Sequence, residues 1–396
     1  MVYILLFLFL LIPVIRYDLF AKKGGEEIWY WTSFFFLVLV AGLRYRVGGD
    51  TLVYMAEFNM YPKLDELRYF DFETARFNPL WYIIAAFSRS IDDSFTCFQI
   101  IHAIIVNFTF FHFFRKYCPR YYFTAILVWF YGYWCYFNME VLREVLCVCL
   151  LLWATDFLLG NKWLRYYLVC VLALFIHVSA VVMLFIPLAK ILFRRPNWKV
   201  QLIILSCVVV FTLAVDIPLL ITKMLSLNDQ LSTVIENYLQ ADLKNLTGKL
   251  YELAKYLPVF GVLWLREKNR FEDEYDFIPY VSCMVIFYGF SSYLGVAGRF
   301  LNYFVPFFIV LLVNTLYDCI MEIKWREKGF SALVALCVVM VLTFNYSRYY
   351  FRDSSETYPD THAYNLFVPY HSVLNPVVDD KREGFVENLR DFAIVF

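Results

Sequence analysis

One stretch of the chain, from Ile28 to Asp50, reads IWYWTSFFFLVLVAGLRYRVGGD. Its first part, up to Leu43, is apolar enough for a membrane-spanning helix, and Arg44 and Arg46 follow directly. Cationic side chains at the end of an apolar helix are expected at the membrane surface, where they reach the polar headgroups. The stretch therefore predicts an integral membrane protein with guanidinium groups and a carboxylate beside the bilayer.

The composition of the whole chain supports this class. Of 396 residues, 61% are hydrophobic and 18% are charged. A soluble domain of this size does not carry so much apolar surface, so we expect an all-α, polytopic membrane protein. The net charge is zero without a dense basic run, which argues against nucleic acid as a partner. Most of the ten cysteines lie in or beside apolar stretches, so no metal or other cofactor is expected.

Apolar stretches along the chain predict about twelve membrane crossings, because a helix of about 20 apolar residues spans a bilayer and shorter ones suffice where it thins. The predicted crossings are 2–15, 28–43, 95–114, 121–137, 141–159, 166–176, 178–193, 200–215, 250–265, 277–294, 300–320 and 330–346. The shorter apolar segment 78–87 is predicted to be re-entrant or interfacial. The stretch 166–193 is interpreted as two short helices that meet at His177, with a single tilted helix as the alternative.

Lysines and arginines orient these helices, because they favour cytoplasmic loops. The loops 44–94 and 216–249 and the C-terminal tail 351–396 are then predicted to share the opposite, extracytoplasmic side. Residues 1–350 are expected to form a single transmembrane domain, since no linker or repeat divides them. Segment 216–248 has apolar residues at helical spacing and predicts an amphipathic surface helix, either a lid or a helix packed on the bundle.

The segment from Arg44 to Asp50 has the composition of an anion-binding loop. Gly48 and Gly49 permit a tight turn with exposed N–H groups, and guanidinium groups bind phosphate oxygens bidentately. We expect Arg44 and Arg46 to bind an anionic substrate, although snorkelling toward lipid headgroups would also explain them. Asp50 is predicted to orient an arginine or to act as a general base, with a surface carboxylate as the remaining alternative.

Further candidate residues lie at the ends of later apolar segments. Glu140, Arg143 and Glu144 fall at a predicted helix start with helical spacing. An arginine there is costly unless it is paired or functional, so Arg143 is expected to bind substrate or to form a structural ion pair. Glu140 is a candidate base. His177 is another, because imidazole titrates near neutrality, and a hydrogen-bonded core histidine is its alternative.

Arg299 follows Gly298 at another predicted helix start. A phosphate there can meet both the guanidinium and the helix N-terminal amides, with interfacial anchoring as the alternative. Tyr303 is predicted on the same helical face. Together with Tyr54, it offers a flat ring and a phenol group to a sugar.

Four segments of the chain, in order, resemble elements of the EpsG family of bacterial exopolysaccharide proteins, which are related to the Wzy polysaccharide polymerases. Segment 42–54 is similar to an Arg-rich, Val-Gly-Thr-Asp element followed by a tyrosine; 139–144 to Asn-x-x-Arg-Gln; 174–180 to Ala-x-x-x-His-x-Ser-Ala; and 298–304 to Arg-x-x-x-Tyr-Phe. Gly49 stands where Thr is usual, and Glu140 and Glu144 replace Asn and Gln. Pro369 and Tyr370 resemble a further element, which suggests that the tail folds back near the site.

The resemblance implies a GT-C-like, metal-independent glycosyltransferase of the bacterial cytoplasmic (inner) membrane. It would polymerise oligosaccharide repeat units carried on undecaprenyl diphosphate into an exopolysaccharide, capsule or O-antigen on the periplasmic face, with a chain-length regulator as a further partner. Its substrate-binding residues would be Arg44, Arg46, Arg143, Arg299, Tyr54 and Tyr303, and its base would be His177, Asp50 or Glu140. An O-antigen-ligase-like transferase and a lipid-linked glycan flippase or transporter are the alternatives; a transporter would favour internal repeats, which the sequence does not show.

Overall fold

The computed structural model describes residues 1–72, 75, 77–193, 198–214, 246–271, 275–291, 297–322, 329–351, 362–384 and 386. Within these ranges the chain forms helices and turns without a β-strand, so the predicted all-α class is confirmed. The α-helices are α1 Val2–Pro13, α2 Glu26–Gly42, α3 Gly49–Glu57, α4 Pro79–Ile91, α5 Phe95–Tyr117, α6 Tyr122–Trp129, α7 Cys135–Met139, α8 Leu142–Leu159, α9 Trp163–Leu174, α10 Val181–Phe185, α11 Ala189–Leu192, α12 Trp198–Ala214, α15 Leu246–Ala254, α16 Leu257–Asn269, α17 Ile278–Ser282, α18 Met284–Ser291, α19 Ala297–Phe300, α20 Val305–Glu322 and α21 Gly329–Tyr350. The predicted amphipathic helix falls mostly on 216–245, which lies outside the described residues.

Among the described residues, three helices are long and apolar enough to cross a membrane: Val2–Leu19, Phe95–Tyr117 and Gly329–Arg348. Shorter apolar helices are Trp163–Leu174, Val178–Leu192, Trp198–Phe211, Ile278–Ser291 and Val305–Ile320. Helices of this composition are typical of an integral membrane protein, which is the class that the composition predicts. The figure of twelve crossings stays a prediction.

The chain divides into two compact units. The first comprises Met1–Leu184 and Phe351–Val386, and the second comprises Phe185–Tyr350 and Glu387–Phe396. The segment before Val386 therefore belongs to the same unit as the N-terminal helices, although it is distant from them in sequence.

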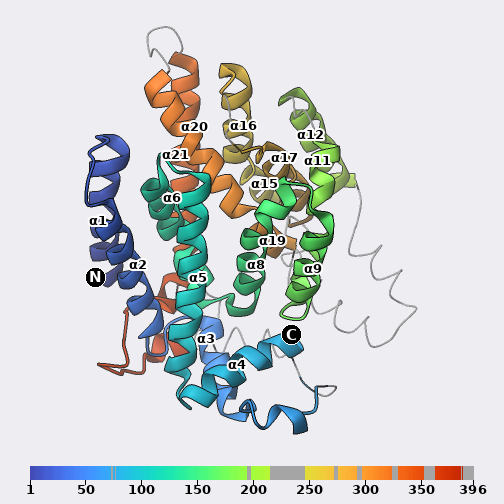
Figure 1. Ribbon diagram of the computed structural model, residues 1–396. Helices are drawn as coiled ribbons and strands as arrows, with labels where there is room; N and C mark the ends of the chain where they lie inside the picture. The colour runs from blue at the N-terminus through green and yellow to red at the C-terminus, as the bar shows by residue number, and fades with distance from the viewer. Residues whose placement is uncertain are drawn as a thin grey trace. The chain divides into compact units, whose positions relative to one another are not determined.

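Helix α5 is the centre of the first unit, where it packs against α2, α4, α6 and α8 (Figure 1). The packing is close: a β-carbon added at Gly42 of α2 would lie 2.8 Å from the Ile100 side chain. A buried polar network links α5 to the segment before α8, because Trp134 Nε1 and Asn138 contact the Asn107 amide at 2.8 and 3.0 Å. These contacts fix the end of α2 and the start of α8, which carry the candidate site.

The stretch 166–193 consists of two short helical pieces that meet at His177, as predicted. Helix α9 ends at Leu174, and the 3₁₀-helix η5 (Val178–Ala180) begins directly after His177, whose backbone is extended. The break fits the sequence, because the polar imidazole and the following Ser179 hydrogen-bond each other instead of extending a helix.

Helix α4 covers the segment predicted to be re-entrant or interfacial. It has 13 residues, fewer than the roughly 20 that a crossing requires. Its N-terminus is fixed to the end of α9, because Leu80 N donates to Phe175 O and Asn78 Nδ2 donates to Leu174 O, both at 2.9 Å. The start of α4 is thereby joined to the residues that directly precede His177.

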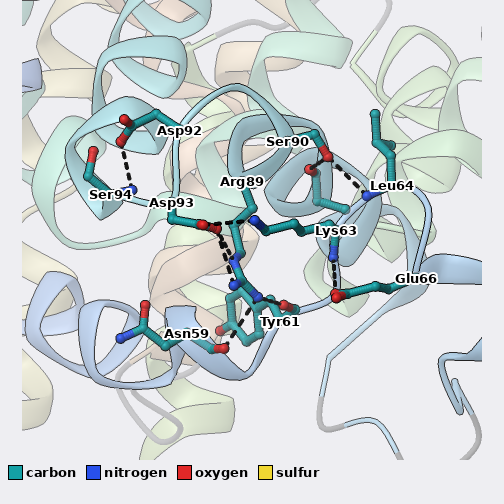
Figure 2. Close-up of polar contacts among 11 residues, drawn as sticks. Asn59, Tyr61, Lys63, Leu64, Glu66, Arg89, Ser90, Asp92, Asp93 and Ser94 are labelled. Atoms are coloured by element: carbon teal, nitrogen blue, oxygen red, sulfur yellow. Dashed lines mark hydrogen bonds and ion pairs between the residues drawn. The ribbon is translucent and has the colours of Figure 1, made fainter.

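The other end of α4 fixes the loop that follows α3 (Figure 2). The Arg89 guanidinium donates to the backbone oxygens of Asn59, at 3.2 Å, and Tyr61, and to the Asp93 carboxylate at 3.3 Å. Asp93 also accepts from Lys63 Nζ at 2.7 Å. One arginine therefore connects the loop backbone to the C-terminal end of α4.

In the second unit, helix α16 packs against α20 and α21 (Figure 1). Arg266 of α16 is buried and donates to Thr315 Oγ1 and Asp318 Oδ2 of α20, each at 3.1 Å. A β-carbon added at Gly261 would lie 2.5 Å from Val338 of α21. Glycine thus permits the close approach of α16 and α21, and the ion pair joins α16 to α20.

Candidate anion-binding site

The loop between α2 and α3 turns sharply and lies against the α7–α8 turn. Arg46 and Gly48 both have positive φ, at 51° and 99°. A β-carbon added at Gly48 would lie 2.4 Å from the Met139 carbonyl oxygen. Only glycine combines this backbone conformation with so close an approach, so Gly48 sets the position of the loop.

Arg44 lies inside this loop and is only 1% exposed. Its guanidinium donates to Val47 O at 3.3 Å, to Thr51 Oγ1 at 3.1 Å and to Ala41 O. Burial lowers the pKa of Arg44 to about 10, so the group remains cationic at neutral pH. These contacts give Arg44 a structural role, because its hydrogen bonds join the loop backbone to the end of α2 and to the start of α3.

Glu140 occupies the N-terminus of α3. Its carboxylate accepts from Gly49 N at 2.5 Å, and the adjacent Met139 O accepts from Thr51 Oγ1 at 2.9 Å. The first N–H groups of a helix lack helical partners and attract anions, so a carboxylate stands where the sequence predicts a phosphate. Burial, and then the neighbouring Asp50 carboxylate, raise the pKa of Glu140 above its usual range.

Arg143 contacts aromatic side chains and lacks the predicted glutamate partners. Its Nε donates to Tyr54 OH at 2.8 Å, and its guanidinium carbon lies 4.1 Å from the centre of the Phe77 ring. The alternative of a structural ion pair with Glu140 is wrong, because α8 begins at Leu142 and Glu140 in the preceding turn faces α3 instead. Within the described part of the chain, no further hydrogen bond engages the two terminal nitrogens of Arg143.

Arg46 forms a bidentate ion pair with Glu383 of the C-terminal tail. The two bonds join Nε to Oε1 at 2.6 Å and Nη2 to Oε2 at 2.7 Å. The side chains are 29% and 24% exposed, and the hydrogen bond raises the pKa of Arg46 above its usual value. Sequence reasoning considered Asp50 as the partner of an arginine and missed Glu383, because no spacing rule reaches across 337 positions.

The tail itself lies along the loop, so the prediction that it folds back is confirmed. The backbone bonds are Tyr45 N to His371 O (2.9 Å), Gly48 N to Leu366 O (2.8 Å) and Val373 N to Leu43 O (2.9 Å). The buried Arg382 guanidinium donates to Arg46 O at 2.9 Å, to Asn365 O at 3.0 Å and to Pro369 O. Arg382 is a second residue that sequence reasoning missed.

His177 belongs to the same unit, and η5, which follows it, packs against α8. Its Nδ1 accepts from Ser179 N at 3.1 Å and lies 2.7 Å from Ser179 Oγ. A neutral imidazole whose Nδ1 accepts a hydrogen bond carries its proton on Nε2. In this tautomer His177 offers a donor, whereas a general base offers a lone pair.

The predicted site residues fall in both units. We call the loop between α2 and α3, residues 43–48, the arginine loop. The first unit brings this loop together with Asp50, Tyr54, Glu140 and Arg143 around α3. Arg299 and Tyr303 belong to the second unit, where Arg299 is exposed in the short helix α19 and Tyr303 is buried in η7 (Leu301–Tyr303). Asp50 is partly exposed in the first turn of α3, one helical turn before Tyr54.

Comparison with known proteins assigns the chain to a family. No curated protein and no solved structure matches it. The sequence pattern of the EpsG family matches residues 27–372. This range includes the arginine loop, the α7–α8 turn, His177, Arg299 and the beginning of the tail, and it ends before Arg382 and Glu383. Because the match covers most of the chain, the protein belongs to the EpsG family.

Proposed function

We propose that this protein is a polysaccharide polymerase that joins oligosaccharide repeat units carried on undecaprenyl diphosphate, on the periplasmic face of the bacterial inner membrane. Membership of the EpsG family implies a polymerase-like role in polysaccharide synthesis. The observation that carries the specific proposal is a pair of arginines that retain N–H donors: Arg46 in the loop before α3, and Arg143 of α8, which contacts Tyr54 of α3.

The chemistry requires cationic groups at the leaving diphosphate. When the sugar–phosphate bond breaks, negative charge develops on the diphosphate, and preorganised donors stabilise that charge in the transition state. A guanidinium has five N–H donors. Glu383 engages two donors of Arg46, and Tyr54 engages one donor of Arg143. The remaining donors of the two arginines match the two phosphates of the leaving group.

The acceptor hydroxyl needs a base as it attacks the anomeric carbon. Asp50 suits this role best among the three candidates because it is partly exposed, whereas Glu140 and His177 are each only 9% exposed. Glu140 already accepts from Gly49 N, and His177 accepts through Nδ1. We assign proton removal to Asp50 and the support of the loop to Glu140.

In vitro extension of a defined lipid-linked repeat unit tests the function. Purified wild-type protein is expected to form long chains on the lipid, and Arg46→Lys or Arg143→Lys is expected to lower the rate by about 10²-fold, because a point charge does not reproduce a guanidinium fork. Arg115→Lys is the matched control, since Arg115 forms a bidentate pair with Glu27 at the opposite end of α2.

Three outcomes would contradict the proposal. Unchanged chain length with a folded Arg46→Lys protein would remove the diphosphate role. Transfer of finished glycan to a different acceptor, without growth on the carrier, would identify a ligase. Movement of the lipid-linked unit across the bilayer without bond formation would identify a flippase.

A further inference from the structure

Two adjacent residues of the tail contact Arg46, one at its backbone and the other at its side chain. Arg382 donates to its backbone oxygen at 2.9 Å, and Glu383 accepts from its guanidinium at 2.6 and 2.7 Å. The match to the EpsG family ends at residue 372, so neither residue lies in the part of the chain that defines the family. The predicted arginine loop therefore depends on residues outside the family pattern.

The orientation of the Arg46 guanidinium follows from which edge Glu383 occupies. Nε and Nη2 form the side edge of the group, and both donate to the carboxylate. The end edge, formed by Nη1 and the second N–H of Nη2, has no partner among the described residues. With the carboxylate on the side edge, the end edge remains for a second ligand and can bind an anion bidentately.

The backbone of Arg46 also needs support. Its φ of 51° lies in the left-handed region, which is unfavourable for a residue with a side chain unless its surroundings hold it. Arg382, which is buried, bonds the Arg46 carbonyl and two carbonyls of the tail. The Arg382 guanidinium thereby fixes the backbone of Arg46, and with it the position from which the Arg46 side chain extends.

We propose that Arg382 and Glu383 are positioning residues, which hold Arg46 so that its free edge binds the diphosphate of the lipid-linked substrate. The inference rests on the proposed function. Glu383 remains bound to Arg46 when the substrate arrives, because the two ligands use different edges of the guanidinium. The tail is therefore part of the substrate site.

Glu383→Ala separates this role from a purely structural one. We expect its KM for the lipid-linked donor to rise about two- to tenfold, since the Arg46 side chain must then be ordered by the substrate. The thermal midpoint should stay close to that of the wild type, because an ion pair between partly exposed side chains contributes little to stability. Glu383→Asp, which keeps the carboxylate, should recover part of the loss. Glu27→Ala removes a second bidentate Arg–Glu pair and should leave KM unchanged.

A double-mutant cycle with Arg46 completes the test. In the Arg46→Ala background, Glu383→Ala should change KM no further, because the residue that it positions is gone. An unchanged or lowered KM for Glu383→Ala would overturn the inference, and a lowered value would show that Glu383 competes with the substrate. Equal effects of Glu383→Ala in both backgrounds would also overturn it.

Direct binding of undecaprenyl diphosphate in detergent distinguishes failure of the inference from failure of the function. If wild-type protein binds this lipid but does not extend glycans, the polymerase proposal fails, and weaker binding by Glu383→Ala still supports the positioning role. If wild-type protein does not bind the lipid, both fail. If it binds and extends but Glu383→Ala binds equally well, only the inference fails.

Discussion

Three arginines of similar sequence context have different surroundings. Arg44 directs its donors into its own loop, Arg46 binds Glu383, and Arg143 contacts Tyr54 and Phe77. Residue type and position predicted one role for all three. The distinction depends on burial, because the donors of a fully enclosed guanidinium are out of reach of a substrate, whereas those of a partly exposed one remain accessible.

Gly48 offers a test of the loop geometry at a single position. Gly48→Ala should lower stability by about 2–4 kcal/mol, because it adds a clash with the Met139 carbonyl to the cost of a positive φ. Gly24→Ala is the matched control: Gly24 also has a positive φ, 90°, but nothing lies within 4 Å of an added β-carbon. Thermal melting in detergent measures both, and equal losses would show that the contact with Met139 does not matter.

His177→Asn tests whether the imidazole exchanges a proton. Asparagine is a favoured helix N-cap, so its side-chain oxygen can replace Nδ1 as the acceptor of Ser179 N–H. We expect the variant to fold and to keep glycan extension within about threefold, since the base is assigned to Asp50. Asp50→Asn should instead lower the rate by about 10²-fold or more. A folded but inactive His177→Asn protein would show that the histidine takes part in the reaction and would contradict the assignment of the base to Asp50 alone.

At the scale of single residues, the sequence named candidate positions but not the partners that the structure gives them. Helical spacing suggested that Glu140 faces Arg143, whereas the chain turns between α7 and α8 and directs the carboxylate to Gly49. Spacing rules assume an unbroken helix. They also describe only local neighbours, so Glu383 as the partner of Arg46 was beyond their reach.

Among the elements, the segment between α3 and α4 depends most on one side chain. Arg89→Leu removes its bonds to the backbone of Asn59 and Tyr61 and to Asp93 (Figure 2). We expect tryptic cleavage at Lys63 and Arg68 to accelerate about tenfold, as local opening becomes easier. Asp92→Asn is the control, because Asp92 accepts from Ser94 N on the other side of the turn. An unchanged cleavage rate would show that other contacts hold the loop.

The neighbouring ion pair has a defined pH range. The hydrogen bond from Lys63 is the main cause that lowers the pKa of Asp93. A carboxyl group with a lowered folded-state pKa stabilises the structure above its unfolded pKa, and the contribution is lost as the pH falls through the folded value. The Lys63–Asp93 contact is therefore expected to persist throughout the neutral range and to break only in acid.

The positions of the helices were predicted better than the side-chain contacts between them. The break at His177 was predicted because a polar residue interrupts an apolar run, a signal that is local and strong. The short segment predicted over 78–87 falls on α4, Pro79–Ile91. The bounds of α8, Leu142–Leu159, agree with the predicted 141–159, but Glu140 does not belong to that helix. The turn at Glu140 is stabilised by a contact with α3 that no local pattern encodes.

At the scale of the whole molecule, the predicted orientation places the loop after α3 and the α8–α9 turn on opposite sides of the membrane. In a variant with Cys97, Cys207 and Cys337 replaced by serine, Asp65→Cys should react with a membrane-impermeant maleimide in intact spheroplasts. Lys162→Cys should react only after permeabilisation, and both introduced positions are exposed. The reverse pattern would place the arginine loop in the cytoplasm and contradict a periplasmic site.

The contact between the loop and the tail has a consequence for biosynthesis. Arg46 is synthesised 337 positions before its partner Glu383. Gly48, whose amide bonds Leu366 O, likewise precedes its partner by most of the chain. A polypeptide that ends before the tail carries the N-terminal helices but lacks Leu366, Arg382 and Glu383, and with them the bonds that join the loop to the tail. The proposed binding of a lipid-linked substrate through Arg46 would therefore become possible only once the tail has been translated.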